Sequence, residues 1–374
     1  RRVQTIDNKK PAASWRKSVG RGPTKSTMKI VKLFLALCAV LSGIECNDSR
    51  KLVNDYPTIG VLTQEISYYL NQKYPDRYHS YVPASYVKFL EGGGAKVAPI
   101  WIGKPREYYE DLMSKINGVL FPGGATFFNQ SAGYAEAGAH IFEVAKQMND
   151  RGKFMPIWGT CLGFELLTYL SANGTEHRSR CSSNNQPLPL EFKDGSRLFG
   201  EAPRDVIEIL STEPVTANFH HFCVTEKNLT QLGLDKEWKV LSVNQDWNGF
   251  NFISSIEHFK YPFYGVQFHP EKNIYEWVRN KNISHTSNAI RAAQYFSDFF
   301  VNETRKNENK FPNKSDELNS LIYNYMPTFT AKKGSAFFQS YMFEEVESSD
   351  SGSTSPHAYL CTTLLLIGCC LVHL

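Results

Sequence analysis

Short apolar runs alternate with helical segments between residues 57 and 170, and this alternation constrains the fold more than any other feature of the sequence. Each apolar run is shorter than a typical helix and is followed by a glycine or by a longer segment with helical character. Strands that alternate with helices in this way form a parallel sheet covered on both faces. The predicted strands are 58–63, 96–101, 118–121 and 155–158, and the predicted helices are 85–91, 108–116, 135–150 and 164–170.

The region from about 187 to 257 differs, because its apolar runs are separated by turn residues and not by helices. It is predicted to add strands at 206–210, 240–243 and 252–257, followed by a strand at 264–267 and a closing helix at 288–306. The fold class is therefore α/β, a mostly parallel sheet with helices on both faces and extra strands between about 187 and 257.

The charge of the chain is unevenly distributed. Residues 1–32 carry ten Lys or Arg and one Asp, so the formal net charge of +4 leaves −5 for residues 33–374. That acidic body has no dense basic run interleaved with aromatic residues, which argues against a nucleic-acid partner. Hydrophobic residues make up 42% of the chain, enough for a sizeable core.

A basic stretch at 28–32 precedes twelve apolar residues (33–44) and a small-residue boundary, the arrangement of a secretory signal peptide. We predict that this signal occupies residues 28–46 and that 1–27 is a non-native upstream segment. A buried core helix is the alternative for this run. Asn-x-Ser/Thr sequons support a secreted or lysosomal, lumenal glycoprotein. The candidate glycosylation sites are Asn129, Asn173, Asn228, Asn282, Asn302 and Asn313, with a further sequon at Asn47.

The C-terminal tail, residues 346–374, joins a small, polar spacer to an apolar stretch that runs to the last residue. This is the arrangement of a signal for a GPI anchor, which would attach the protein to a membrane without spanning it. The alternatives are an artefact of the gene model or a tail that docks on the body.

Three of the eight cysteines, Cys161, Cys181 and Cys223, lie in the main body. An odd number in an oxidising compartment allows one pair and one free thiol, and a lone free thiol is a candidate nucleophile. Cys181 and Cys223 could be bridged or free. No pair has CxxC spacing, so we predict no metal site and no cofactor.

Cys161 has the surroundings of a nucleophile. It follows an apolar strand, precedes a helix and lies between Gly159 and Gly163, the strand–turn–helix arrangement of a nucleophile elbow. The helix N-terminus is expected to lower the pKa of the thiol, and the N–H of Leu162 should point at the reacting carbonyl. An ordinary buried cysteine is the alternative.

His269 is the candidate base. It ends an apolar strand, so it should lie at the same sheet edge as Cys161, and Glu271 two residues later can accept its other N–H. A third element, the strand that ends in Phe121-Pro122-Gly123-Gly124, could offer the N–H of Gly124 as a second oxyanion donor beside Leu162.

These three elements together resemble the class I glutamine amidotransferase-like family and, within it, the gamma-glutamyl hydrolases. The resemblance covers about residues 55–345, the predicted catalytic domain, and is carried by long strings. These strings are 60–64 (GVLTQ), 84–88 (ASYVK), 116–124 (INGVLFPGG), 158–165 (WGTCLGFE), 210–220 (LSTEPVTANFH) and 261–271 (YPFYGVQFHPE).

The resemblance implies a flavodoxin-like fold, often as a homodimer, and cysteine-dependent hydrolysis of γ-glutamyl amide bonds in folate poly-γ-glutamates. It implies Cys161 as nucleophile, His269 as base and acid with Glu271 as its partner, and His220 and Gly123 in contact with substrate. From the residues alone, His220 beside His221 would be structural.

Two departures bear on this interpretation. Amidotransferases usually carry His-Gln where this chain has Phe164-Glu165, and the hydrophobic C-terminal extension is unusual among gamma-glutamyl hydrolases. The alternatives are a glutaminase-type subunit that supplies ammonia to a partner and an inactive glycosylated binding protein of the same fold.

Overall fold

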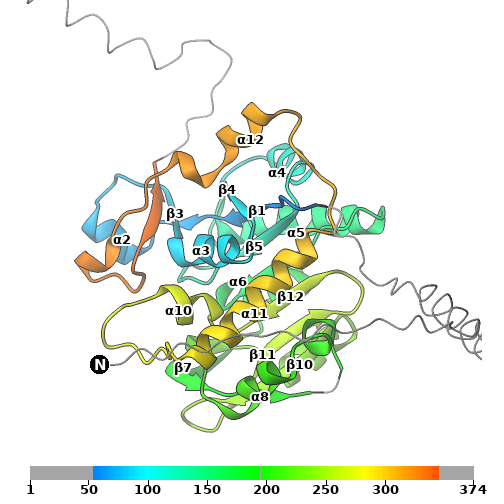
Figure 1. Cartoon of the computed structure of the whole chain (residues 1–374), viewed down its shortest axis with the longest axis vertical. Coiled ribbons are helices and arrows are strands. Elements are labelled where there is room, and N and C mark those ends of the chain that lie inside the picture. The colour runs from blue at the N-terminus through cyan, green and yellow to red at the C-terminus, as the bar shows by residue number, and fades with distance from the viewer. Residues whose placement is uncertain (1–53, 194, 345–374) are drawn as a thin grey trace, which may run out of the picture. The chain divides into compact units, whose positions relative to one another are not determined.

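The computed structural model describes residues 54–193 and 195–344, which are built around one eight-stranded sheet (Figure 1). Neighbouring strands from β4 to β12 are parallel, and the remaining strands are added antiparallel. In spatial order they are β4 (Lys96–Ile100), β1 (Thr58–Leu62), β5 (Gly118–Phe121), β6 (Ile157–Thr160), β12 (Phe263–Val266), β11 (Asn251–His258), β10 (Trp238–Gln245) and β8 (Glu191–Phe192).

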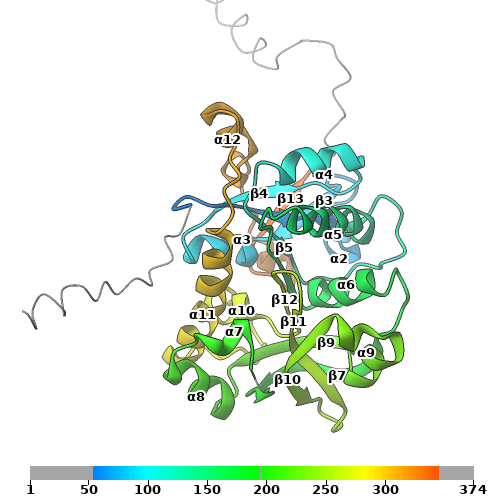
Figure 2. The same cartoon turned by 90° about the vertical axis from the view of Figure 1, so that its right-hand side faces the viewer.

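Helices cover both faces of this sheet, and each face has its own apolar core (Figure 2). The central strands are buried along their whole length, as expected when helices shield both faces. One face carries α4 (Arg106–Met113), α5 (Tyr134–Asp150), α6 (Leu162–Ser171) and α9 (Glu226–Leu232). The other carries α3 (Ala84–Gly92), α8 (Arg204–Thr212), α10 (Pro270–Tyr275) and α11 (Ser287–Thr304).

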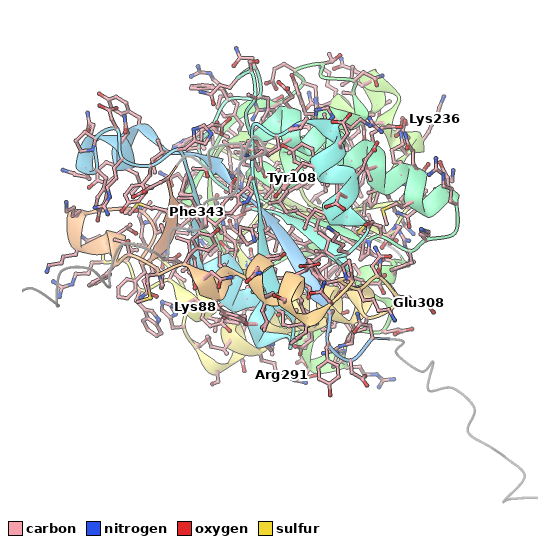
Figure 3. The ribbon with its side chains drawn as sticks, turned by 90° about the horizontal axis from the view of Figure 1, so that it is seen from above. Lys88, Tyr108, Lys236, Arg291, Glu308 and Phe343 are labelled. Atoms are coloured by element: carbon pink, nitrogen blue, oxygen red, sulfur yellow. A yellow bond between two sulfur atoms is a disulfide. The ribbon has the colours of Figure 1, made fainter. Side chains whose placement is uncertain are left out.

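Two small antiparallel sheets flank the carboxyl end of the central strands. One joins β13 (Ser340–Phe343), β3 (Ser80–Pro83) and β2 (Gln64–Glu65), so the end of the described chain returns to its beginning. Phe343 packs on Trp101 with ring centroids 4.7 Å apart, and Figure 3 shows Phe343 from above. The other sheet pairs β7 (Ser179–Leu188) with β9 (Thr216–Cys223).

Short elements complete the described chain. They are α2 (Tyr68–Lys73), α7 (Arg197–Gly200), α12 (Lys314–Ser320) and three 3₁₀ turns, Leu234–Lys236, Ile322–Asn324 and Thr330–Lys333.

The predicted α/β class, the parallel sheet and most of its strands and helices are confirmed. The strand predicted at 206–210 is wrong, because these residues belong to helix α8. Val206, Ile209 and Leu210 are buried at helical spacing, whereas Asp205 and Glu208 are exposed. The strand predicted at 155–158 is shifted, since β6 runs on to Thr160 and delivers Cys161 directly.

The predicted upstream segment, signal peptide and C-terminal tail lie outside the described residues. Among the helices of residues 54–193 and 195–344, none is long and apolar enough to cross a membrane.

Candidate active site

Cys161 lies on a sharp turn between β6 and α6, where it is the N-cap of the helix with φ 51° and ψ −107°. Its N–H donates to Val266 O at 2.8 Å, which fixes the turn against β12. The flanking glycines make the turn possible. A Cβ on Gly163 would overlap the carbonyl group of Phe121, and one on Gly159 would lie 2.5 Å from Gly163 O. The predicted elbow is therefore present, with its positive φ.

His269 and Glu271 form a buried pair at the end of β12. His269 Nδ1 lies 2.7 Å from Glu271 Oε1, and both side chains are almost completely inaccessible. If Nδ1–H donates to the carboxylate, Nε2 is left as the basic nitrogen. Gly123 shows how close the imidazole is to the thiol, because a Cβ on it would be 2.8 Å from His269 Cε1 and 3.0 Å from Cys161 Cβ. The prediction that the elbow and the His-Pro-Glu strand meet at one edge is confirmed.

Tyr86, on α3, also belongs to this cluster and was not selected from the sequence. Its hydroxyl lies 3.2 Å from His269 Nδ1 and accepts the N–H of Gly123 at 2.9 Å. Burial and the nearby carboxylate of Glu271 raise the pKa of Tyr86 well above its ordinary value, so the hydroxyl keeps its proton. Tyr86 therefore links the glycine turn to the His269–Glu271 pair. A tyrosine in an amphipathic helix carries no local signal for this role.

A second polar chain lies behind the thiol. Gln267 Nε2 donates to Glu165 Oε1 at 3.0 Å and lies 3.9 Å from Cys161 Sγ. Glu165, which is buried, also pairs with Arg178 at 2.8 Å. Glu165 and Gln267 stand next to motif residues in the sequence, but the pairing with Arg178 could not be found there, since it joins α6 to the start of β7.

Burial decides the protonation of the site. It raises the pKa of the Cys161 thiol well above its ordinary value, and the carboxylates of Glu165 and Glu271 add to the effect. The Leu162 N–H and the Lys272 ammonium act in the opposite direction but are outweighed. Burial also lowers the pKa of His269, although Glu271 opposes this. The expectation of a lowered thiol pKa was therefore wrong, because desolvation exceeds the effect of the helix N-terminus, and the resting pair is neutral.

The two predicted oxyanion donors are Leu162, the residue after Cys161, and Gly124, which lines the same groove as Cys161. Leu162 begins α6, and its N–H acts to lower the pKa of the Cys161 thiol. Gly124 lines the groove that contains Cys161, and its N–H has no acceptor among the described residues. The N–H of Gly123 is already taken by Tyr86, so Gly123 provides space next to the imidazole rather than a free donor.

A groove of about 530 Å³ opens over Cys161 and His269. Its walls come from the start of α2, from β9 with Phe219, from α10 with Lys272, and from the loop before β13 with Phe337. This volume falls in the range of sites that bind small organic molecules. The site is thus assembled at the carboxyl edge of the parallel strands from segments far apart in the sequence.

His220 is not among the residues that line this groove. It is 4% exposed, its Nδ1 lies 3.1 Å from Phe222 O, and its Nε2 lies 3.2 Å from Asn218 Oδ1. Burial and the nearby His269 lower its pKa to about 3, so it is neutral. Its neighbour Phe219 lines the groove instead. The role of His220 in substrate contact stays a prediction.

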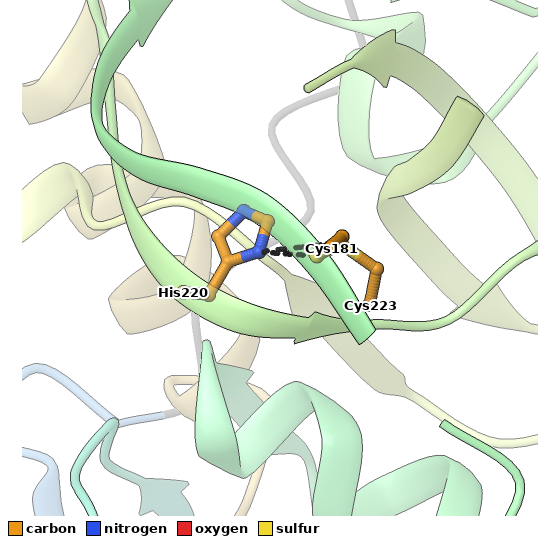
Figure 4. A group of neighbouring side chains, drawn as sticks. All are labelled: Cys181, His220 and Cys223. Carbon is orange, nitrogen blue, oxygen red and sulfur yellow. Dashed lines mark hydrogen bonds between the residues drawn. A yellow bond between two sulfur atoms is a disulfide. The ribbon is translucent and has the colours of Figure 1, made fainter. Parts of the chain in front are cut away.

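Cys181 and Cys223 form a disulfide that joins β7 to β9 beside His220 (Figure 4). Cys161 is then the free cysteine of the described residues. The sulfur atoms lie 3.5 and 3.3 Å from His220 Nδ1, a grouping that could hold a metal ion if the thiols were free. In the bridged form neither sulfur is a thiolate, and a thiolate is the form that binds zinc.

Removing this bridge should destabilise the protein. It closes a separation of 42 residues, for which chain entropy gives about 4 kcal/mol of unfolding free energy. The double variant Cys181→Ser/Cys223→Ser should therefore unfold at lower urea concentration than the wild type. Reductant should shift the wild type to the same midpoint and leave the variant unchanged. An equal shift of both by reductant would assign the effect to another group.

This fold and this arrangement of thiol, imidazole and carboxylate are those of an α/β protein with a candidate Cys–His–Glu site. A family model described as Peptidase C26 matches residues 57–271. Gamma-glutamyl hydrolase of Bos taurus is 41% identical over 316 residues, 83% of this chain and 97% of that protein. The Homo sapiens gamma-glutamyl hydrolase is 40% identical over the same shares, and gamma-glutamyl hydrolase B of Dictyostelium discoideum is 36% identical over 82% of this chain and 87% of its own.

The chain therefore belongs to the gamma-glutamyl hydrolase family, and it is a hydrolase.

Proposed function

We propose that the protein hydrolyses γ-glutamyl amide bonds in folate poly-γ-glutamates, with Cys161 as nucleophile, His269 as base and acid, and Glu271 as the group that orients His269. The observation that carries this proposal is that Cys161 and His269 both lie close to Gly123 and line one groove, with Glu271 hydrogen-bonded to His269 behind it. Membership of the gamma-glutamyl hydrolase family supports the choice of bond.

The reaction proceeds in two halves. His269 Nε2 takes the thiol proton as Cys161 Sγ attacks the γ-carbonyl carbon, and the N–H groups of Leu162 and Gly124 stabilise the oxyanion. His269 then gives the proton to the leaving amine as the C–N bond breaks, which leaves a thioester. Water, losing a proton to His269, cleaves the thioester and restores the thiol. No step requires a cofactor.

Product analysis by mass spectrometry tests the substrate. Folate pentaglutamate should be shortened, and the ladder of products shows whether cutting is terminal or internal. Free glutamine serves as the control for the rival function. Ammonia from glutamine with no shortening of the pentaglutamate would move the protein to the glutaminase type, and neither activity would favour the inactive binding protein.

The pH dependence of kcat/KM should show an acid limb below pH 6.5. The competent form carries neutral His269, and burial lowers the pKa of His269 from 6.5, so the neutral form persists to lower pH. Because Glu271 raises that pKa, Glu271→Gln should move the limb further down as well as reduce the rate. Exposed Glu226→Gln should leave the limb in place. A limb that moves upward in Glu271→Gln would contradict the assignment.

We also propose a secreted or lysosomal location, supported by the disulfide and by exposed sequons at Asn129, Asn173 and Asn313. Enzymatic deglycosylation of protein from a secreting eukaryotic host should lower its mass, and an unchanged mass would contradict glycosylation. The homodimer and the GPI anchor stay predictions from the sequence, to be checked by light scattering and by release with a phospholipase.

A further inference from the structure

Lys272 places a positive charge in the groove beside the reacting groups. It lies in the first turn of α10, three residues after His269, and is 6% exposed. The groove that contains Cys161 and His269 is partly lined by Lys272, and its charge acts on the pKa of both groups. An ammonium in this position faces whatever occupies the groove.

The Lys272 ammonium has no close anionic partner among the described residues, although its charge opposes the rise that burial causes in the pKa of Glu276. The ammonium lies over the faces of Phe337 at 4.4 Å and Phe219 at 5.5 Å, and it makes no ion pair within 4.0 Å. Of the neighbouring carboxylates, Glu271 binds His269 through Oε1 and Glu276 Oε2 accepts the N–H of Phe338 at 2.7 Å, whereas Glu271 Oε2 and Glu276 Oε1 have no hydrogen-bond partner among the described residues. A buried charge is costly unless it is paired, and aromatic faces compensate only in part. The missing partner is therefore expected from the ligand.

Lys281 supplies a second ammonium to the same groove. It is exposed, it lies 5.5 Å from the centroid of the Phe219 ring that Lys272 also approaches, and it forms no ion pair in the described part of the chain. Two unpaired ammonium groups therefore approach one aromatic ring, the first buried near the thiol and the second nearer to solvent. This local charge stands against the net acidic character of residues 33–374.

We propose that Lys272 binds one of the two α-carboxylates that flank the scissile bond and that Lys281 binds an α-carboxylate of the γ-glutamyl chain beyond these two. The inference rests on the proposed function and names two side chains that recognise the carboxylates of its substrate. A γ-linked chain carries one free α-carboxylate next to every amide bond, so an ammonium at a fixed place near the thiol recognises the linkage itself. A second ammonium further out recognises chain length.

A cycle of enzyme and substrate changes tests the role of Lys272. The substrates are pteroyl di-γ-glutamate, which has a single γ-amide bond, and two analogues in which one α-carboxylate beside that bond is a carboxamide. The wild type should cleave one of the two analogues with a kcat/KM about 10- to 100-fold lower than that for the parent diglutamate. This is the range for the loss of a hydrogen bond to a charged group. Lys272→Met should cleave that analogue and the parent compound at similar rates. Any general effect of the charge on Cys161 is common to both substrates and cancels.

A measurement of Tm distinguishes a role of Lys272 in substrate recognition from a purely structural role. Lys272→Met keeps the length of the side chain and removes a buried charge that has no ion pair within 4.0 Å, so its Tm should not fall below that of the wild type. Lys88→Met is the matched control, because Lys88 (labelled in Figure 3) is half-buried on α3, does not line the groove and donates to Gln339 Oε1. Lys88→Met should leave the ratio of kcat/KM between the parent compound and each carboxamide analogue unchanged. A lower Tm for Lys272→Met together with equal losses on parent and analogues would overturn the proposal.

Chain length tests Lys281. Lys281→Ala should raise KM for the pentaglutamate by about two- to fivefold, as expected for an exposed ion pair, and leave KM for the diglutamate unchanged. Equal effects of Lys281→Ala on the KM for the pentaglutamate and on the KM for the diglutamate would contradict the role proposed for Lys281. If the wild type shortens neither substrate, the proposed function is overturned. If the wild type cuts both substrates, but the losses in kcat/KM from the lysine substitution and from the substrate change are additive, only the assignment of the lysines is overturned.

Discussion

Replacing Cys161 by alanine should reduce turnover of a folate pentaglutamate by more than about 10⁴-fold, as for other nucleophiles that act as a unit with their base. The fold should survive, because alanine fills the same buried turn and only the sulfur atom is lost. Cys161→Ser, which keeps a hydroxyl at this position, should be similarly inactive, since neutral His269 is matched to a thiol and serine is far harder to deprotonate.

The measurement is single-turnover product formation, with circular dichroism and Tm as controls for folding. Mass spectrometry of quenched wild type should also detect an acyl group on Cys161, and the alanine variant should show none. Because the other described cysteines are bridged, thiol labelling reports on this residue within that part of the chain. If Cys161→Ala kept activity within tenfold of wild type, water would have to attack directly, and the covalent route would be wrong.

Replacing Gly163 by alanine should cost more stability than any other glycine change at the elbow. The added Cβ would overlap the Phe121 carbonyl and lie 2.6 Å from its carbon atom, and both clashing atoms are backbone atoms of the central sheet. Overpacking of this kind costs about 1–3 kcal/mol or more, because neither β5 nor α6 can move independently. Phe121 leads into Gly123 and Gly124, so the shift would also disturb the oxyanion site and lower kcat.

Gly200→Ala is the matched control. Nothing lies within 4 Å of its ideal Cβ, and it lies in helix α7 without a positive φ. Its free energy of unfolding should stay within about 0.5 kcal/mol of wild type. Urea midpoints of the two variants decide the matter. Similar midpoints for Gly163→Ala and Gly200→Ala would mean that the elbow can relax.

The sequence by itself determined the features that are encoded locally. A glycine on each side of Cys161 specifies the turn, and short apolar runs alternating with helices specify the parallel sheet. Since carboxyl ends of parallel strands share one edge, these two facts already bring Cys161 and His269 together. Glu271 follows because it is two residues from His269 in the chain.

Local sequence patterns did not predict the features that depend on packing between distant parts of the chain. Residues 206–210 resemble a strand by composition, but the apolar face that they bury against α11 and the sheet makes them a helix. The pairing of Cys181 with Cys223 depends on the register of β7 against β9.

Only the tertiary structure decided which distant side chains complete the site and what charge they carry. Tyr86 and Arg178 reach it from separate elements, and no spacing in the sequence connects them with Cys161 or His269. The charge of Cys161 depends on the difference between a helix N-terminus, which favours the thiolate, and burial beside two carboxylates, which opposes it. Both contributions are set by distances and solvent exclusion, and these quantities exist only once the chain has folded.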